Sequence, residues 1–126
     1  MMNILLVGVG GAFGSIARYL MIAVIGRAFS DGVFPYGTLT VNVVGCFAIA
    51  FIGALAADKI NLTAEARLFL FTGVLGGFTT FSAFGYETFY FLRTSHFLLA
   101  FLNVAANLIF GLGAILLGYW LGRNLG

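Results

Sequence analysis

Charged side chains are scarce in this chain, since Asp, Glu, Lys and Arg make up 8% of its 126 residues, against about 25% in a soluble domain. They give a formal net charge of +2 and form no basic cluster interleaved with aromatic residues. Nucleic acid is therefore not an expected partner. The single cysteine, Cys46, excludes an intrachain disulfide and a cysteine-rich metal site.

Apolar residues fill the chain instead, at 62% of the total, and proline occurs once. The apolar runs are long enough to cross a hydrocarbon core of about 30 Å, where helices and closed barrels alone satisfy their own backbone. The composition predicts an all-α integral membrane protein of four spans, forming a single domain over residues 1–126. The predicted spans run approximately from Asn3 to Gly26, Tyr36 to Ala57, Ala66 to Leu92 and Phe97 to Leu121.

The basic residues are divided almost evenly between the two sides of the membrane. Four spans place both chain ends on one side, which collects Lys59, Arg67 and Arg123. The other side collects Arg27 and Arg93, with Arg18 within reach. Because orientation depends on an imbalance of Lys and Arg, this near tie predicts insertion in both orientations and makes an antiparallel homodimer available.

Two further local features are predicted from short patterns. Thr63, just before the third span, is a suitable N-cap. Small residues recur at intervals that allow close helix packing, namely Gly10 with Gly14, Gly45 with Gly53, and Gly111 with Ala114 and Gly118.

The third span contains an interruption of its apolar sequence, from Gly76 to Phe84, with paired glycines and three hydroxyl residues. Irregular backbone at membrane depth survives where protein or a wet cavity satisfies it, so we expect a broken helix and an ion site. Released carbonyls there suit a small cation, and the following half-helix favours an anion. Alternatively, the hydroxyls of Thr79, Thr80 and Ser82 bond back to the preceding turn.

Phe81 and Phe84 are expected to meet on one face of the helix that follows the interruption. A phenyl ring has a positive edge, so rings presented edge-on can stabilise a partly dehydrated anion without a fixed charge that would trap it. The alternative is an ordinary lipid-facing or core role, but the neighbouring glycines favour the ion path.

Three asparagines lie inside apolar spans: Asn42 in the second, and Asn103 and Asn107, four residues apart, in the fourth. Asn42 has two N–H donors for an anion, or it makes an interhelical hydrogen bond, and the two interpretations are evenly balanced. The pair in the fourth span either lines a wet path or forms an amide ladder between packed helices.

Two charged residues also lie within the spans, where a charge costs about 2.5–3.5 kcal/mol at mid-helix. Arg18 is either an interfacial anchor or an anion-attracting vestibule group. Glu87 either accepts hydrogen bonds at a pore end or reaches the interface. A proton-carrying role for Glu87 is the weaker alternative.

The chain resembles the Fluc (CrcB) family of microbial fluoride channels across all four spans. The resemblance is carried by Gly-Gly-x-Thr-Thr-Phe-Ser-x-Phe at Gly76 to Phe84, by Gly-Thr-Leu-x-Val-Asn at Gly37 to Asn42, and by the glycine-rich first span that ends in Arg18 and Tyr19. The chain departs from the family at Ala83, where threonine is common, and in the fourth span, where amides replace a stripe of hydroxyls.

The resemblance implies a dual-topology antiparallel homodimer in the bacterial inner membrane, with two fluoride pores for passive export and no enzymatic activity. It also implies a central structural sodium ion, held by the backbone carbonyls of Gly76 and Thr79. The implied pore residues are Asn42, Phe81, Phe84, Thr80, Ser82, Asn103, Asn107 and Glu87, with Arg18 in the vestibule.

Two other functions remain open at this point. A small multidrug-type, proton-coupled exporter needs an intramembrane acid, yet the first span has no Asp or Glu, and Glu87 lies near a span end. An assembly factor, in which glycines and asparagines serve packing alone, predicts no ion flux from purified protein.

Overall fold

The computed structural model describes residues 1–30 and 32–125, and within these ranges the regular structure is entirely helical. In chain order the elements are α1 (Met2–Ala28), α2 (Tyr36–Asp58), α3 (Ala64–Arg67), η1 (Leu68–Leu75), α4 (Gly76–Phe78), α5 (Phe81–Arg93) and α6 (Phe97–Asn124). The third span runs from α3 to α5, and η1 has the wider π-helical geometry. Four segments of the described chain are long and apolar enough to cross a membrane, which confirms the predicted all-helical, four-span class.

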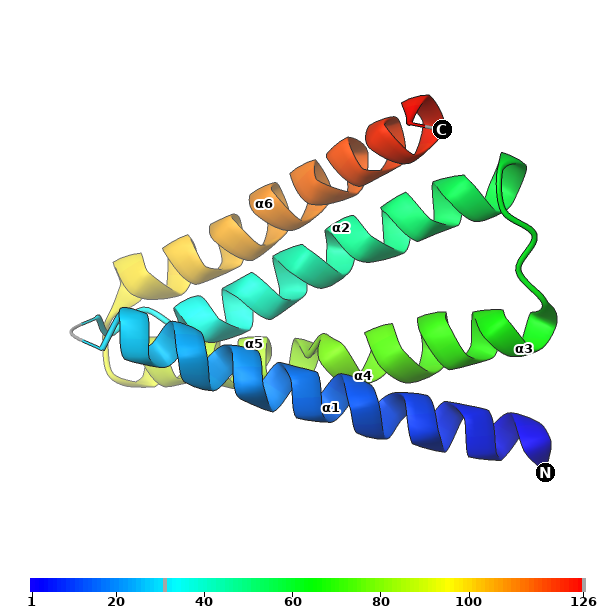
Figure 1. The fold of residues 1–126 in the computed structure, drawn as a ribbon. Coiled ribbons are helices and arrows are strands. Elements are labelled where there is room, and N and C mark those ends of the chain that lie inside the picture. Colours follow the sequence, from blue (N-terminus) through cyan, green and yellow to red (C-terminus); the bar gives the residue numbers. More distant parts are fainter. Residues whose placement is uncertain (31, 126) are drawn as a thin grey trace.

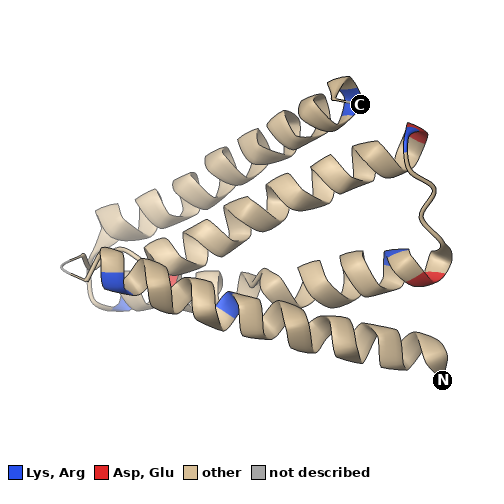
Figure 2. Cartoon of the chain, in the orientation of Figure 1, with Lys and Arg blue, Asp and Glu red and all other residues tan. Residues whose placement is uncertain are grey.

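The spans are arranged as two neighbouring pairs, with α2 beside α6 and α1 beside the third span (Figure 1). Both chain ends and the connection from α2 to α3 lie at one end of the bundle. The connections from α1 to α2 and from α5 to α6 lie at the other (Figure 1). Most charged residues gather at these two ends (Figure 2). Large apolar side chains are exposed along the helices between them, as a lipid-solvated chain requires.

Glycines bring α1 and the third span into backbone contact. A Cβ added at Gly10 would lie 2.6 Å from the carbonyl oxygen of Phe69, and one at Gly77 would lie 2.7 Å from that of Gly11. Gly14 is still tighter, because its added Cβ would overlap the carbonyl oxygen of Val74. The predicted close packing at Gly10 and Gly14 is therefore confirmed, since these distances leave no room for a side chain.

The pairing of α2 with α6 also depends on small residues, although not on all those predicted. A Cβ at Gly118 would lie 2.5 Å from the carbonyl oxygen of Phe47, and one at Gly111 would lie 3.5 Å from Sγ of Cys46. The close packing predicted at Gly53 is not found within the chain, because no atom approaches its added Cβ within 4 Å.

Two sets of hydrogen bonds stabilise the end of the bundle at which the chain termini lie. Thr63 caps α3 as predicted, its Oγ1 accepting a hydrogen bond from the N–H of Ala66 at 3.1 Å. Lys59, which follows α2, donates from Nζ to the carbonyl oxygens of Gly122 and Leu125, each at 3.0 Å, and to that of Arg123. The Lys59 ammonium thus joins the ends of α2 and α6 at the negative end of the α6 dipole.

Replacing Lys59 with methionine is expected to destabilise the folded chain by about 1 kcal/mol, because the last carbonyls of α6 lose a charged donor. Thermal unfolding in detergent measures the change. Asp58→Asn is the comparison variant: it removes only the exposed ion pair with Arg123, 3.9 Å long, and such pairs contribute little. Equal effects of the two variants would contradict a capping role for Lys59.

Candidate ion-conduction site

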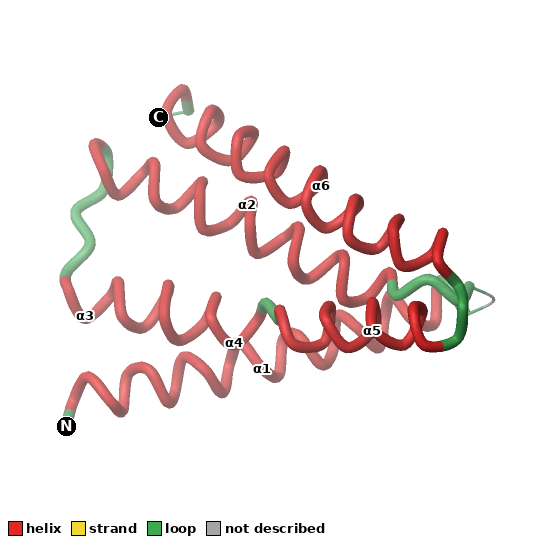
Figure 3. Tube along the Cα trace, turned by 180° about the vertical axis from the view of Figure 1, so that it is seen from behind, coloured by secondary structure: helices red, strands yellow, loops and turns green. Residues whose placement is uncertain are grey.

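The third span is interrupted between α4 and α5 by two residues with extended backbone. Thr79 has φ −86° and ψ 160°, and Thr80 has φ −150° and ψ 113°. The glycines before them and their own β-branched side chains are weak helix formers. The hydroxyl of Thr80 then caps α5 by accepting from the N–H of Ala83 at 3.2 Å. This segment is the loop that separates the two halves of the third span in Figure 3.

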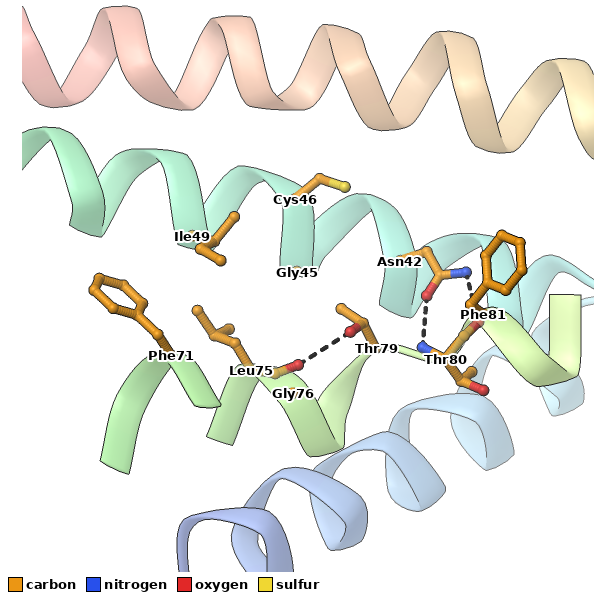
Figure 4. Close-up of a pocket in the computed structure, with 10 residues that line it drawn as sticks. All are labelled: Asn42, Gly45, Cys46, Ile49, Phe71, Leu75, Gly76, Thr79, Thr80 and Phe81. Carbon is orange, nitrogen blue, oxygen red and sulfur yellow. Dashed lines mark hydrogen bonds between the residues drawn. The ribbon is translucent and has the colours of Figure 1, made fainter. Parts of the chain in front are cut away.

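Asn42 of α2 satisfies both backbone polar groups of Thr80. Its Oδ1 accepts from the Thr80 N–H at 2.9 Å, and its Nδ2 donates to the Thr80 carbonyl at 3.2 Å (Figure 4). The same Nδ2 donates to Oδ1 of Asn107 at 3.2 Å. Of the two interpretations left open by the sequence, the structure therefore shows the interhelical hydrogen bond, made here to the backbone of the interruption.

The interruption also releases carbonyl oxygens from the helical ladder. The N–H of Thr80 bonds Asn42, and the N–H of Ala83 bonds the Thr80 hydroxyl. These two N–H groups are the ones that would reach the carbonyls of Gly76 and Thr79 in a continuous helix. Both carbonyls are thus hard oxygen donors without their usual helical partner, and the Gly76 position is exposed. This donor set fits a small hard cation such as sodium.

A groove of about 320 Å³ runs along the interruption. Gly45 allows Thr79 of the interruption to pack closely against α2, because a Cβ at Gly45 would overlap Cγ2 of Thr79. The groove is lined from α2 by Asn42, Gly45, Cys46 and Ile49, and from the third span by Phe71, Leu75, Gly76, Thr79, Thr80 and Phe81 (Figure 4).

Phe81 and Phe84 lie in contact at the start of α5, with ring centroids 5.5 Å apart and planes inclined by 56°. Phe81 is 81% exposed, although it sits at the middle of a span. The neighbouring hydroxyls differ in exposure: Thr80 is buried and Ser82 is exposed, with 3.5 Å between their oxygens. Rings and hydroxyls therefore gather at one place on the surface of the chain.

Glu87 lies further along α5 and accepts a hydrogen bond from the hydroxyl of Thr38 on α2, 2.6 Å long. This oxygen is Oε2, whereas the buried Oε1 has no hydrogen-bond partner among the described residues. The pair borders a cavity of about 240 Å³ beneath the connection from α1 to α2. No role was predicted for Thr38 from the sequence, although it lies one turn before Asn42, on the same face of α2.

Arg18 borders a different cavity. It is half-buried on α1 beside a cavity of about 340 Å³, which it shares with Ser15 and Tyr19. None of the groove-lining residues borders that cavity. Arg18 and the groove residues Asn42 and Phe81 thus border different cavities.

The two amides of α6 are joined to one another and to α5. Asn103 is fully buried and donates from Nδ2 to the hydroxyl of Thr88 at 3.0 Å. Asn107 donates from Nδ2 to the carbonyl and side-chain oxygens of Asn103, at 2.8 and 3.2 Å. Of the two interpretations of this pair, the described contacts are those of an amide ladder.

Comparison with known proteins shows the family. The family model described as "CrcB-like protein, Camphor Resistance (CrcB)" matches residues 5–119 of the chain. The chain belongs to the CrcB family. A relative from Agrobacterium fabrum named "Fluoride-specific ion channel FluC" is 44% identical, over 99% of both chains. Proteins of the same name from Chlorobaculum tepidum and Parabacteroides distasonis are 46% and 42% identical, over 98% and 99% of this chain and 96% of each relative.

These CrcB relatives are ion channels rather than enzymes by name, which agrees with the absence of any catalytic assignment from the sequence. The matched region includes the second and third spans, most of α1 and α6, and every residue of the groove. Family membership thus confirms the resemblance drawn from Gly76 to Phe84 and from Gly37 to Asn42.

Proposed function

We propose that this CrcB protein is a fluoride-selective channel that releases fluoride passively down its gradient. The observation that carries the proposal is the polar interruption of the third span, flanked by the phenyl rings of Phe81 and Phe84. The names of relatives at 42–46% identity, each a fluoride-specific ion channel, support the same ion. No covalent chemistry is required.

Selectivity follows from the size and hydration of the ion. Ring edges of Phe81 and Phe84 and the hydroxyls of Thr80 and Ser82 replace part of the fluoride hydration shell in a narrow path, where larger chloride fits poorly. Asn42 forms the polar wall beside them. Because all these groups are neutral, the ion is stabilised without being held too tightly to leave.

The functional unit in this proposal is an antiparallel homodimer with two pores, in the inner membrane of a bacterium. Phe81 is largely exposed and Gly76 is exposed beside the groove, so a second copy is needed to enclose the path. The near-even distribution of basic residues at the two ends of the bundle supports insertion in both orientations (Figure 2). The twofold axis passes near the interruption.

A structural sodium ion belongs to the same proposal. The carbonyls of Gly76 and Thr79 would hold it, because their helical donors are bonded elsewhere. Two copies of the chain would supply a set of hard oxygen ligands around the ion. Bound sodium would then contribute a fixed positive charge at the subunit interface and stabilise the released backbone.

The remaining site residues have roles at the ends of the path. Arg18 attracts fluoride into a vestibule, and Glu87 with its Thr38 hydrogen bond marks the far end. Asn103 and Asn107 lie behind Asn42 and are joined to it by hydrogen bonds.

The test is fluoride efflux from sodium-loaded liposomes that contain the purified protein, recorded with a fluoride-selective electrode. We expect electrogenic fluoride efflux, and chloride-loaded vesicles serve as the control. An assembly factor would give no flux of either ion. Equal flux of fluoride and chloride would overturn the selectivity, and no fluoride flux would overturn the channel.

A proton-coupled exporter is the second candidate, favoured by the buried, unpartnered Oε1 of Glu87. Glu87→Gln separates the two functions. Under the channel proposal, the variant keeps fluoride efflux within about threefold of the parent, because an amide oxygen still accepts from Thr38. Complete loss of transport, together with proton-driven export of an organic cation by the parent protein, would favour the exporter instead.

A further inference from the structure

A continuous chain of hydrogen-bonded amides joins α6 to the interruption in the third span. Its first donor is the backbone N–H of Thr80, which bonds Oδ1 of Asn42 at 2.9 Å. Asn42 donates in turn to Oδ1 of Asn107, and Asn107 donates to Oδ1 of Asn103, both at 3.2 Å. Three amides on two helices are therefore linked head to tail.

The chain of amides returns to the element from which it started. Asn103 donates from Nδ2 to the hydroxyl of Thr88 at 3.0 Å, and that hydroxyl donates to the backbone carbonyl of Phe84 at 2.9 Å. Both ends of the chain thus lie on the segment from Thr80 to Thr88. This segment carries the rings and hydroxyls of the proposed path.

The direction of the bonds is determined by the Thr80 end of the chain of amides. A backbone N–H can only donate, so the oxygen of Asn42 must face Thr80 and its NH₂ must face Asn107. Asn107 must then turn its oxygen toward Asn42 and its NH₂ toward Asn103. Asn103 in turn directs its oxygen toward Asn107 and its NH₂ toward Thr88. Reversing any one amide would place two donors or two acceptors face to face. Asn103 is fully buried, and such an unmatched contact is costly in a low-dielectric interior.

We propose that Asn107 and Asn103 are positioning residues, which hold the Asn42 oxygen on the Thr80 N–H and so fix the geometry of the interruption without touching the ion. This inference rests on the proposed function, because it concerns the same site. Asn103 has no exposed surface for an ion to reach. The Nδ2 and Oδ1 atoms of Asn107 are both engaged by neighbouring amides. The two amides of α6 therefore act through Asn42, which holds both backbone polar groups of Thr80.

The primary test is Asn107→Leu, which keeps a similar volume and cuts the chain next to Asn42. Protein labelled with ¹⁵N-threonine reports hydrogen exchange at the backbone N–H of Thr80, and liposomes report fluoride efflux. We expect exchange at Thr80 to accelerate by about tenfold or more, since one buried hydrogen bond loses its support. Fluoride efflux should fall by a similar factor. The backbone N–H of Thr72, inside η1 and outside the chain of amides, serves as the internal reference in every variant.

Asn124→Leu is the matched control, because it makes the same change on the same helix at an exposed position outside the chain of amides. Both readouts should remain at parent values. If Asn107→Leu does not fold, Thr88→Val provides the same test. Valine has the shape of threonine but lacks the hydroxyl that accepts from Asn103. Exchange at Thr80 should then rise by about threefold.

Two results would overturn the positioning role. Unchanged exchange at Thr80 in the folded variants would show that the α6 amides do not support Asn42. Reduced efflux with unchanged exchange would instead assign Asn107 a direct contact with the ion. If the parent protein carries no fluoride, the proposed function fails by itself, and the exchange measurement still decides whether the amides hold Thr80.

Discussion

Isoleucine in place of Phe81 or Phe84 is expected to lower fluoride efflux by about tenfold or more per substitution. Isoleucine keeps much of the apolar volume but has no ring edge to stabilise a dehydrated anion, and tenfold corresponds to about 1.4 kcal/mol. Phe81 is 81% exposed in the chain, so its replacement should alter the conducting path more than the fold of the subunit. The measurement is the initial electrode-recorded efflux per reconstituted protein molecule.

Phe101→Ile provides the matched control for both rings. Phe101 lies on α6, is 67% exposed and is not among the groove-lining residues. Its substitution should leave efflux within about twofold of the parent, because surface changes away from a site have small effects. Undiminished efflux in both Phe81→Ile and Phe84→Ile would remove the rings from the mechanism.

The number and positions of the spans could be predicted from sequence because polar residues occur where apolar runs end. The observed limits of the four spans differ from the predicted ones by no more than three residues. The Thr63 cap followed from an equally local pattern and is confirmed. Such features depend on the sequence within one or two turns of a helix.

Contacts between helices were harder to predict, since they depend on how each helix is rotated about its axis. In soluble proteins a polar face determines that rotation, but these spans are apolar on all sides. The alternatives for Asn42 stayed open because its partner, Thr80, lies 38 residues away. A second glycine pair, Gly73 and Gly77, was overlooked although its spacing matches that of Gly10 and Gly14.

The fourth span illustrates the limit most clearly. The spacing of Asn103 and Asn107 placed both amides on one face of a helix, and the structure places them on the face toward Asn42. Spacing alone could not distinguish an ion-lining stripe from a ladder, because both require the same face. The complete burial of Asn103 and its bond to Thr88 are three-dimensional facts that favour the ladder.

Alanine at Gly14 is expected to prevent α1 from packing on the third span, at a cost of about 3 kcal/mol or more in the free energy of unfolding. The added Cβ would overlap the carbonyl oxygen of Val74 and lie 2.9 Å from the backbone nitrogen of Phe78. Both obstacles are backbone atoms, so no side-chain rotation relieves the clash. The measurements are thermal unfolding in detergent and fluoride efflux.

Gly8→Ala separates this clash from the general effect of alanine in a helix. Gly8 lies on the same α1 helix, and no atom approaches its added Cβ within 4 Å, so the substitution should be neutral or slightly stabilising. Equal behaviour of the two variants would contradict the close approach at Gly14. The packed segment of the third span leads directly into Gly76 and Gly77. Gly14→Ala should therefore abolish efflux even in the fraction of protein that remains folded, because moving α1 displaces the interruption on which the proposed path depends.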